Sequence, residues 1–209
     1  IEMAKQKYDH MFDVILIGDT GVGKSKLLNS YLGERNSCTK PAISWDRRYP
    51  CIKLQGKKIA LRILDPSPAY DERMDFMYKK MMGAILMYNT NKRESFDNVT
   101  KWFQRFIVQN IYNAEKILLG TSFVNHGFLP RREVSKERGQ QLASSLGISF
   151  REIHSEDDLA GINEAFETIA NAILLRYLYP TGELLPEEKE VGDNDDDDDG
   201  AANDICSTM

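Results

Sequence analysis

The chain has 209 residues, of which 42% are hydrophobic and 28% are charged, a composition typical of one globular domain with room for a tail. A net charge of −5 argues against a nucleic-acid partner. The three scattered cysteines, Cys38, Cys51 and Cys206, fit neither a disulfide framework nor a metal site and indicate a reducing compartment.

No apolar run approaches the ~18 residues of a membrane-spanning helix. The first residues, Ile1-Glu2-Met3, lack a signal-peptide pattern. We therefore expect a cytoplasmic protein.

Apolar runs and their spacing predict strands that alternate with helices along most of the chain. The expected strands are 12–17, 47–54, 57–64, 84–88, 117–119 and 148–153, and the expected helices are 24–33, 72–82, 95–108, 136–146 and 161–177. Only the second and third strands follow one another directly, and Gln55-Gly56 between them predicts a tight hairpin. This order predicts an α/β fold with a mostly parallel six-stranded sheet, one antiparallel edge strand and about five helices.

Local signals set several helix boundaries. Ser95 and Ser135 are expected to cap the helices that they precede, and Gly33 and Gly147 to end the helices before them. The helix over 95–108 is expected to bury one face, made of Phe96, Val99, Phe103, Phe106 and Ile107.

One motif carries chemistry by itself: Gly18-Asp19-Thr20-Gly21-Val22-Gly23-Lys24-Ser25 fits the phosphate-binding pattern G-x-x-x-x-G-K-[ST] without a mismatch. A buried strand is expected before it and a helix after it, which is the context that the motif requires. Its glycines let backbone N–H groups point inward at a phosphate, and the helix directs its positive end to the same place. Lys24 is expected to reach the β- and γ-phosphates, and the Ser25 hydroxyl to reach Mg²⁺.

The composition changes after Pro180, and residues 180–209 are expected to form a disordered acidic tail behind a domain over residues 1–179. Asp195, Asp197 and Asp199 imitate the opening of a calcium loop, but Cys206 stands where the closing Glu is needed. We interpret the run as solvated charge. The final residues, Cys206 to Met209, match a farnesylation box in outline, with two non-aliphatic residues inside it. Cys206 is therefore a candidate lipidation site, and whether it is prenylated stays open.

Residues 3–177 resemble a small GTPase of the Rab family, and in particular the exocytic Rabs. The segments that carry the resemblance are Met3-Ala4-Lys5, Leu16-Ile17-Gly18-Asp19, Leu54 to Ile59, Gly83 to Tyr88, Glu94 to Val99 with Trp102, and Ala165 to Ala170. The resemblance implies a P-loop small-GTPase fold and a membrane-recruited switch in vesicle trafficking. It also implies GTP or GDP and Mg²⁺ as ligands, with Ser25 and Asp65 at the metal, and effector and regulatory proteins as partners of a monomer.

Several positions that take part in GTP hydrolysis in the family carry other residues here. Pro68 stands where the family's D-x-x-G has its glycine, and a proline has no N–H to offer the γ-phosphate. Ala69 falls nearest the place of the glutamine that orients the attacking water. Ala42 aligns with the threonine that contacts the metal, and Thr39 could replace it only if the loop slides by three residues. No catalytic residue is therefore predicted, and hydrolysis is expected to be slow or lost.

The base-reading positions depart as well. Thr121 to Val124 replace the family's N-K-x-D, and Val124 removes the carboxylate that binds guanine. Asn36 stands near the place of the aromatic residue that covers the base. In the last loop, which is E-T-S-A-K in the family, Glu152 is kept and His154 is not a family residue. Asn91-Lys92-Arg93-Glu94 resembles the lost motif but follows another strand, so we do not assign it to the base.

Three functions are compatible with this pattern. The first is a Rab-like switch that binds GTP or GDP and hydrolyses slowly. The second is a pseudo-GTPase that acts as an interaction scaffold, with an empty or permanently filled site. The third is a P-loop protein that binds ATP, since no guanine acceptor remains. The family pattern favours the first.

Overall fold

The computed structural model describes residues 8–33, 49–66, 71–111, 113–123 and 131–178. Within these residues a six-stranded sheet has the order β2-β3-β1-β4-β5-β6. Its strands are β1 (His10–Ile17), β2 (Cys51–Leu54), β3 (Lys57–Leu64), β4 (Gly83–Asn89), β5 (Glu115–Thr121) and β6 (Ser149–Ile153). β2 and β3 pair antiparallel and every other pair is parallel, which confirms the predicted sheet with its antiparallel edge strand.

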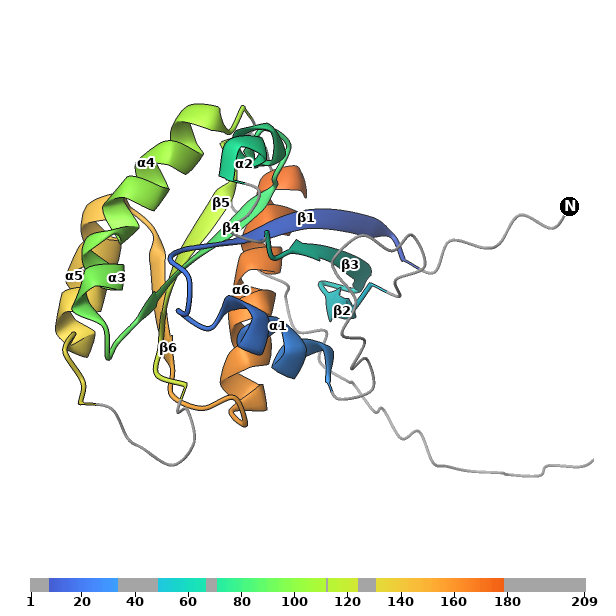
Figure 1. Cartoon of the computed structure of the whole chain (residues 1–209). Coiled ribbons are helices and arrows are strands. Elements are labelled where there is room, and N and C mark those ends of the chain that lie inside the picture. The colour runs from blue at the N-terminus through green and yellow to red at the C-terminus, as the bar shows by residue number, and fades with distance from the viewer. Residues whose placement is uncertain (1–7, 34–48, 67–70, 112, 124–130, 179–209) are drawn as a thin grey trace, which may run out of the picture.

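Helices cover both faces of this sheet (Figure 1). They are α1 (Lys24–Leu32), α2 (Asp71–Tyr78), α3 (Arg93–Asp97), α4 (Val99–Gln109), α5 (Lys136–Leu146) and α6 (Leu159–Leu178). α3 and α4 follow one another through Asn98, so the described residues form five helical units, as predicted.

The alternation of side chains along β1 explains the two layers. Phe12, Val14 and Leu16 enter a core with α1 and α6, where the ring of Tyr31 stacks on that of Phe166 at 3.9 Å. Ile15 and Ile17 point the other way, toward α2 and α4. A third cluster, around Leu86 and Tyr88 of β4, packs against α3, α4 and α5.

Most predicted boundaries shift by a few residues, and two predictions are wrong. Ser95 does not cap its helix, because α3 begins two residues earlier. Instead its buried hydroxyl donates to the Lys92 carbonyl at 2.6 Å and accepts from the Asn89 N–H at 3.0 Å, which ties the helix start to the end of β4. Ile107 was expected in the core but remains 43% exposed, because the buried stripe of α4 passes through Val99 and Phe106.

The predicted caps of α5 are confirmed. The Ser135 hydroxyl accepts a hydrogen bond from the Arg138 N–H, and Gly147 ends the helix in the left-handed conformation. The predicted strand over 47–54 is shorter in the structure: Tyr49 and Pro50 are described but not in the sheet, and β2 begins at Cys51.

Candidate functional site

The phosphate-loop motif, Gly18 to Ser25, lies at the carboxyl end of β1, where the chain turns into α1. This is the sheet edge at which parallel α/β proteins bind ligands. Two glycines make the turn possible. A Cβ on Gly18 would come within 2.2 Å of the Met87 carbonyl oxygen, and one on Gly23, whose φ is +97°, would come within 2.4 Å of the Phe123 ring. The loop thus follows a path that side chains would block.

Lys24 lies inside this loop. Its Nζ donates to the carbonyl oxygens of Gly18 and Asp19, each at 2.7 Å. Burial lowers the pKa of the Lys24 ammonium, and the charges of Asp65 and Asp19 partly offset that effect. A cation held here by carbonyl groups in a partly desolvated place is suited to an anionic ligand, since an anion would restore the stabilisation that burial removes.

Ser25 and Asp65 meet across the loop, as the predicted metal site requires. The Ser25 hydroxyl donates to Asp65 Oδ2 at 2.5 Å, although the two residues are 40 positions apart. Hydroxyl and carboxylate oxygens fit Mg²⁺, which is commonly held by one or two protein oxygens together with substrate phosphates and water. The described residues contain no cluster of three His, Cys, Asp or Glu side chains placed for a metal, and a magnesium ion shared with phosphates does not need one.

The two loops predicted to flank a base also meet. The Ser122 hydroxyl after β5 lies 3.3 Å from His154 Nδ1 and donates to the His154 carbonyl at 3.3 Å. Thr121, which is buried, donates its hydroxyl to the Val22 carbonyl at 2.6 Å and is 3.1 Å from the Tyr88 carbonyl. A single hydroxyl therefore joins the phosphate loop, β4 and β5, a contact that the sequence did not reveal.

Glu152, which the sequence analysis matched to the family's last motif, lies in β6, and its side chain is only 2% exposed. Arg132 pairs with it at 2.5 Å and also donates to the Val134 carbonyl at 2.7 Å. The pair joins the segment before α5 to β6. The second oxygen, Oε2, is buried, and it accepts no hydrogen bond from the described residues.

Phe123 is a further residue that the sequence did not single out. It is 7% exposed and packs with Val22 and Leu27, its ring lying against Gly23. Only its position beside Val124 could have drawn attention to it. The aromatic ring fills the floor of the phosphate loop from the β5 side.

Several predicted positions lie outside the described residues. These are Asn36, Thr39, Ala42, Pro68, Ala69, Val124, Cys206 and the acidic tail. The geometry of the loops that would meet the γ-phosphate and the guanine ring therefore stays a prediction.

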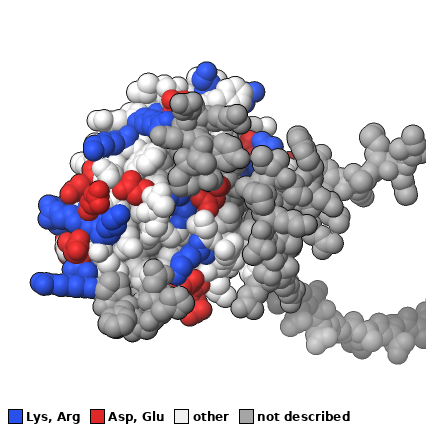
Figure 2. Space-filling model, viewed as in Figure 1, with Lys and Arg blue, Asp and Glu red and all other residues white. Residues whose placement is uncertain are grey.

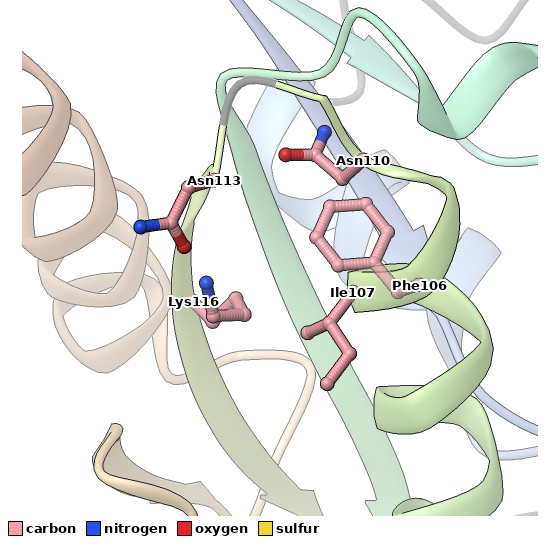
Figure 3. A pocket seen from close by; sticks show the side chains of 5 residues that line it. All are labelled: Phe106, Ile107, Asn110, Asn113 and Lys116. Atoms are coloured by element: carbon pink, nitrogen blue, oxygen red, sulfur yellow. The ribbon is translucent and has the colours of Figure 1, made fainter.

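A hollow of about 260 Å³ lies elsewhere, between the end of α4 and the start of β5. Figure 3 shows its lining residues Phe106, Ile107, Asn110, Asn113 and Lys116. It opens at the amino end of β5, whereas the phosphate loop follows the carboxyl end of β1. Because these strands run parallel, the hollow and the phosphate loop lie at opposite ends of the strands.

The face in Figure 2 shows basic and acidic side chains intermixed, without a continuous basic surface among the described residues. No described helix is both long and apolar enough to cross a bilayer.

Comparisons with known proteins agree with this site. The model of the Ras family matches residues 13–175. The chain is 35% identical over 179 residues to Ras-related protein Rab-10 of Caenorhabditis elegans, a match that covers 83% of this chain and 86% of the relative. It is 36% identical to human Ras-related protein Rab-8B, over 83% of each chain. It is also 36% identical to GTP-binding protein ypt2 of Schizosaccharomyces pombe, over 82% of this chain and 85% of the relative. With its sheet order, its phosphate loop and this family match over most of its length, the chain belongs to the Ras family of small GTPases, and it is Rab-like within that family.

Proposed function

We propose that this protein is a Rab-like switch that binds guanine nucleotide with Mg²⁺ at Gly18 to Ser25 and hydrolyses GTP slowly. The observation that carries the proposal is the convergence of Lys24 Nζ, Ser25 Oγ and Asp65 Oδ2 on the start of α1. These groups supply a cation for the phosphates and two oxygens for a metal, and the first N–H groups of α1 lack partners within the helix.

Each residue has a distinct part in this proposal. Lys24 keeps its two carbonyl acceptors and directs its remaining N–H at phosphate oxygens, while the loop amides surround the phosphate. Ser25 and Asp65 would hold Mg²⁺, as the family resemblance implies. Bound Mg²⁺ would neutralise phosphate charge and orient the phosphates.

Slow hydrolysis follows from residues that would act on the terminal phosphate. Pro68 offers no N–H to the γ-phosphate, and no glutamine occurs from residue 56 to residue 103. Ala42, at the aligned place of the metal-contacting threonine, has no hydroxyl. The chain therefore keeps the groups that bind phosphate and lacks those that align water and sense the third phosphate.

The base would lie between the segment after β5 and the segment after β6, which Ser122 and His154 join. Thr121 supports the phosphate loop from this side, through its hydrogen bond to the Val22 carbonyl. Val124 supplies no carboxylate for guanine. Selectivity over adenine should be weak, and the ATP-binding alternative differs from this proposal only in the base.

A thermal-shift panel tests the proposal. Ligands that bind only the folded state raise its stability by RT ln(1 + [L]/Kd), so GDP and GTP with Mg²⁺ should raise the melting temperature by several degrees. Binding of ATP alone would favour the third function. No shift with GDP, GTP or ATP, in protein shown to carry no nucleotide already, would favour the interaction scaffold.

Val124→Asp separates base recognition from phosphate binding. The new carboxylate should accept two hydrogen bonds from guanine, and a bidentate base contact is worth about 1–3 kcal/mol. The ratio of GDP to ADP affinity should therefore rise by about fivefold to a hundredfold. Val124→Asn is the matched control. Asparagine has the shape of aspartate without its charge, so the GDP-to-ADP affinity ratio should rise less than in Val124→Asp. An unchanged ratio in Val124→Asp would show that this position does not face the base.

The remaining parts of the proposal concern the rest of the chain. Residues 1–179 form the switch domain, and the segments between α1 and β2 and around α2 meet effector and regulatory proteins. Residues 180–209 form an acidic tail, and Cys206 is the candidate site of a lipid that would attach the protein to the cytosolic face of a membrane. Mass spectrometry of the native carboxyl terminus identifies that modification directly.

A further inference from the structure

Asp19, the second residue of the phosphate loop, is bound by a helix far along the chain. Its Oδ1 accepts a hydrogen bond from Trp102 Nε1 at 2.6 Å, and its Oδ2 accepts one from Asn98 Nδ2 at 2.8 Å. Both donors come from the start of α4, 79 and 83 residues away. Hydrogen bonds to an ionised carboxylate are among the stronger ones in proteins, and here both oxygens are engaged.

The two donors form one unit on α4. Asn98 precedes the helix and Trp102 lies one turn later, so their side chains share a face. The backbone N–H of Trp102 donates to the backbone carbonyl of Asn98 at 3.1 Å, which fixes the spacing of the two residues. The Trp102 ring also packs against two core clusters, so its indole N–H is held in place by the sheet and helices around it.

Asp19 connects this unit to the site itself. Its side chain binds α4, while its backbone carbonyl accepts the hydrogen bond from Lys24 Nζ at 2.7 Å. Movement of Asp19 would therefore displace an acceptor of the lysine that meets the phosphates. A carboxylate beside a phosphate site would repel the ligand if it were free to turn inward, and the two α4 donors hold it outward.

We propose that Asn98 and Trp102 are positioning residues of the phosphate site. They hold the carboxylate of Asp19 against α4, and through Asp19 they keep the first residues of the loop and Lys24 in the arrangement that binds phosphate. This inference rests on the proposed function, because its effect is read through bound nucleotide. If it holds, nucleotide affinity depends on Asn98 and Trp102 as well as on the residues of the phosphate loop.

The test measures release of fluorescently labelled GDP from the loaded full-length protein with Mg²⁺ present. Trp102→Phe removes the indole donor and keeps an aromatic ring, and Asn98→Ala removes the amide donor. Each should speed release by about tenfold, because each removes one hydrogen bond to a charged group next to Lys24. Phe103→Leu is the control: it trims the neighbouring side chain of α4, which packs in the third core cluster, and release should stay within about twofold.

Thermal midpoints of the same variants separate positioning from simple destabilisation. If Trp102 and Asn98 only stabilise the fold, release should follow the loss of stability, and Phe103→Leu should speed it as much as they do. The indole N–H resonance of Trp102, one of two tryptophans in the chain, should also shift in Asn98→Ala as Asp19 is loosened.

The outcomes distinguish the two proposals. Unchanged release from both variants, in a protein that holds GDP, would overturn the positioning role and leave the proposed function intact. A wild-type protein that binds no nucleotide would overturn the proposed function, and the positioning role with it.

Discussion

Lys24→Ala should abolish the retention of nucleotide. Lys24 supplies the cation that the site offers to the phosphates, and a hydrogen bond to a charged group is worth about 1.5–3 kcal/mol. With contacts to two phosphates, the affinity for GDP should fall by about a hundredfold or more. Isothermal titration or displacement of a labelled nucleotide measures this loss.

Lys57→Ala is the control for Lys24→Ala. Lys57 is an exposed lysine at the start of β3, in the hairpin at the edge of the sheet, and its removal makes the same change in net charge. GDP affinity should remain that of the wild type in this variant. Near-normal GDP affinity in Lys24→Ala would show that the loop does not hold phosphate as proposed, whereas normal partner binding in a protein without nucleotide would favour the scaffold.

Intrinsic GTP hydrolysis should be at least about tenfold slower than the ~4 × 10⁻⁴ s⁻¹ of Ras. The reason is chemical: Pro68 cannot donate a backbone N–H, and Ala69 cannot orient water as a glutamine would. Single-turnover conversion of GTP to GDP in preloaded protein gives the rate, and nucleotide release measured in parallel corrects for loss of substrate.

The double replacement Pro68→Gly with Ala69→Gln should raise this rate without a large change in GDP affinity, since neither residue is expected to contact the α- or β-phosphate. Pro68→Ala is the matched control, because alanine restores the backbone N–H but lacks the backbone conformational range of glycine. Wild-type turnover as fast as that of Ras would contradict the prediction that these two positions slow hydrolysis.

The sheet could be predicted because its signals are local. Apolar runs at Phe12 to Ile17 and Ala84 to Tyr88 are long enough to identify buried strands, and Gln55-Gly56 identifies the hairpin. Ser95 was misassigned because a serine before an apolar helix usually caps it. Here the helix starts at Arg93, and the buried hydroxyl of Ser95 bonds the turn after β4 instead.

The phosphate-loop motif could be recognised in the sequence because it is contiguous. The contacts that support it could not, because they join distant parts of the chain. Thr121 meets the Val22 carbonyl across 99 residues, and Trp102 meets Asp19 across 83. Nothing in the spacing of the sequence marks such a pair, since it depends on how the sheet and α4 place these residues near the loop after β1.

The nucleotide content of the purified full-length protein tests the proposed function most directly. The protein is denatured, and the released small molecules are separated and quantified against protein concentration. A bound nucleotide at close to one equivalent is the expected result, since Lys24, Ser25 and Asp65 converge as phosphate and magnesium require. The base of that nucleotide distinguishes the guanine-binding proposal from the ATP-binding alternative. Protein that releases no nucleotide, and takes up none when GDP or GTP is supplied with Mg²⁺, would contradict the proposed function.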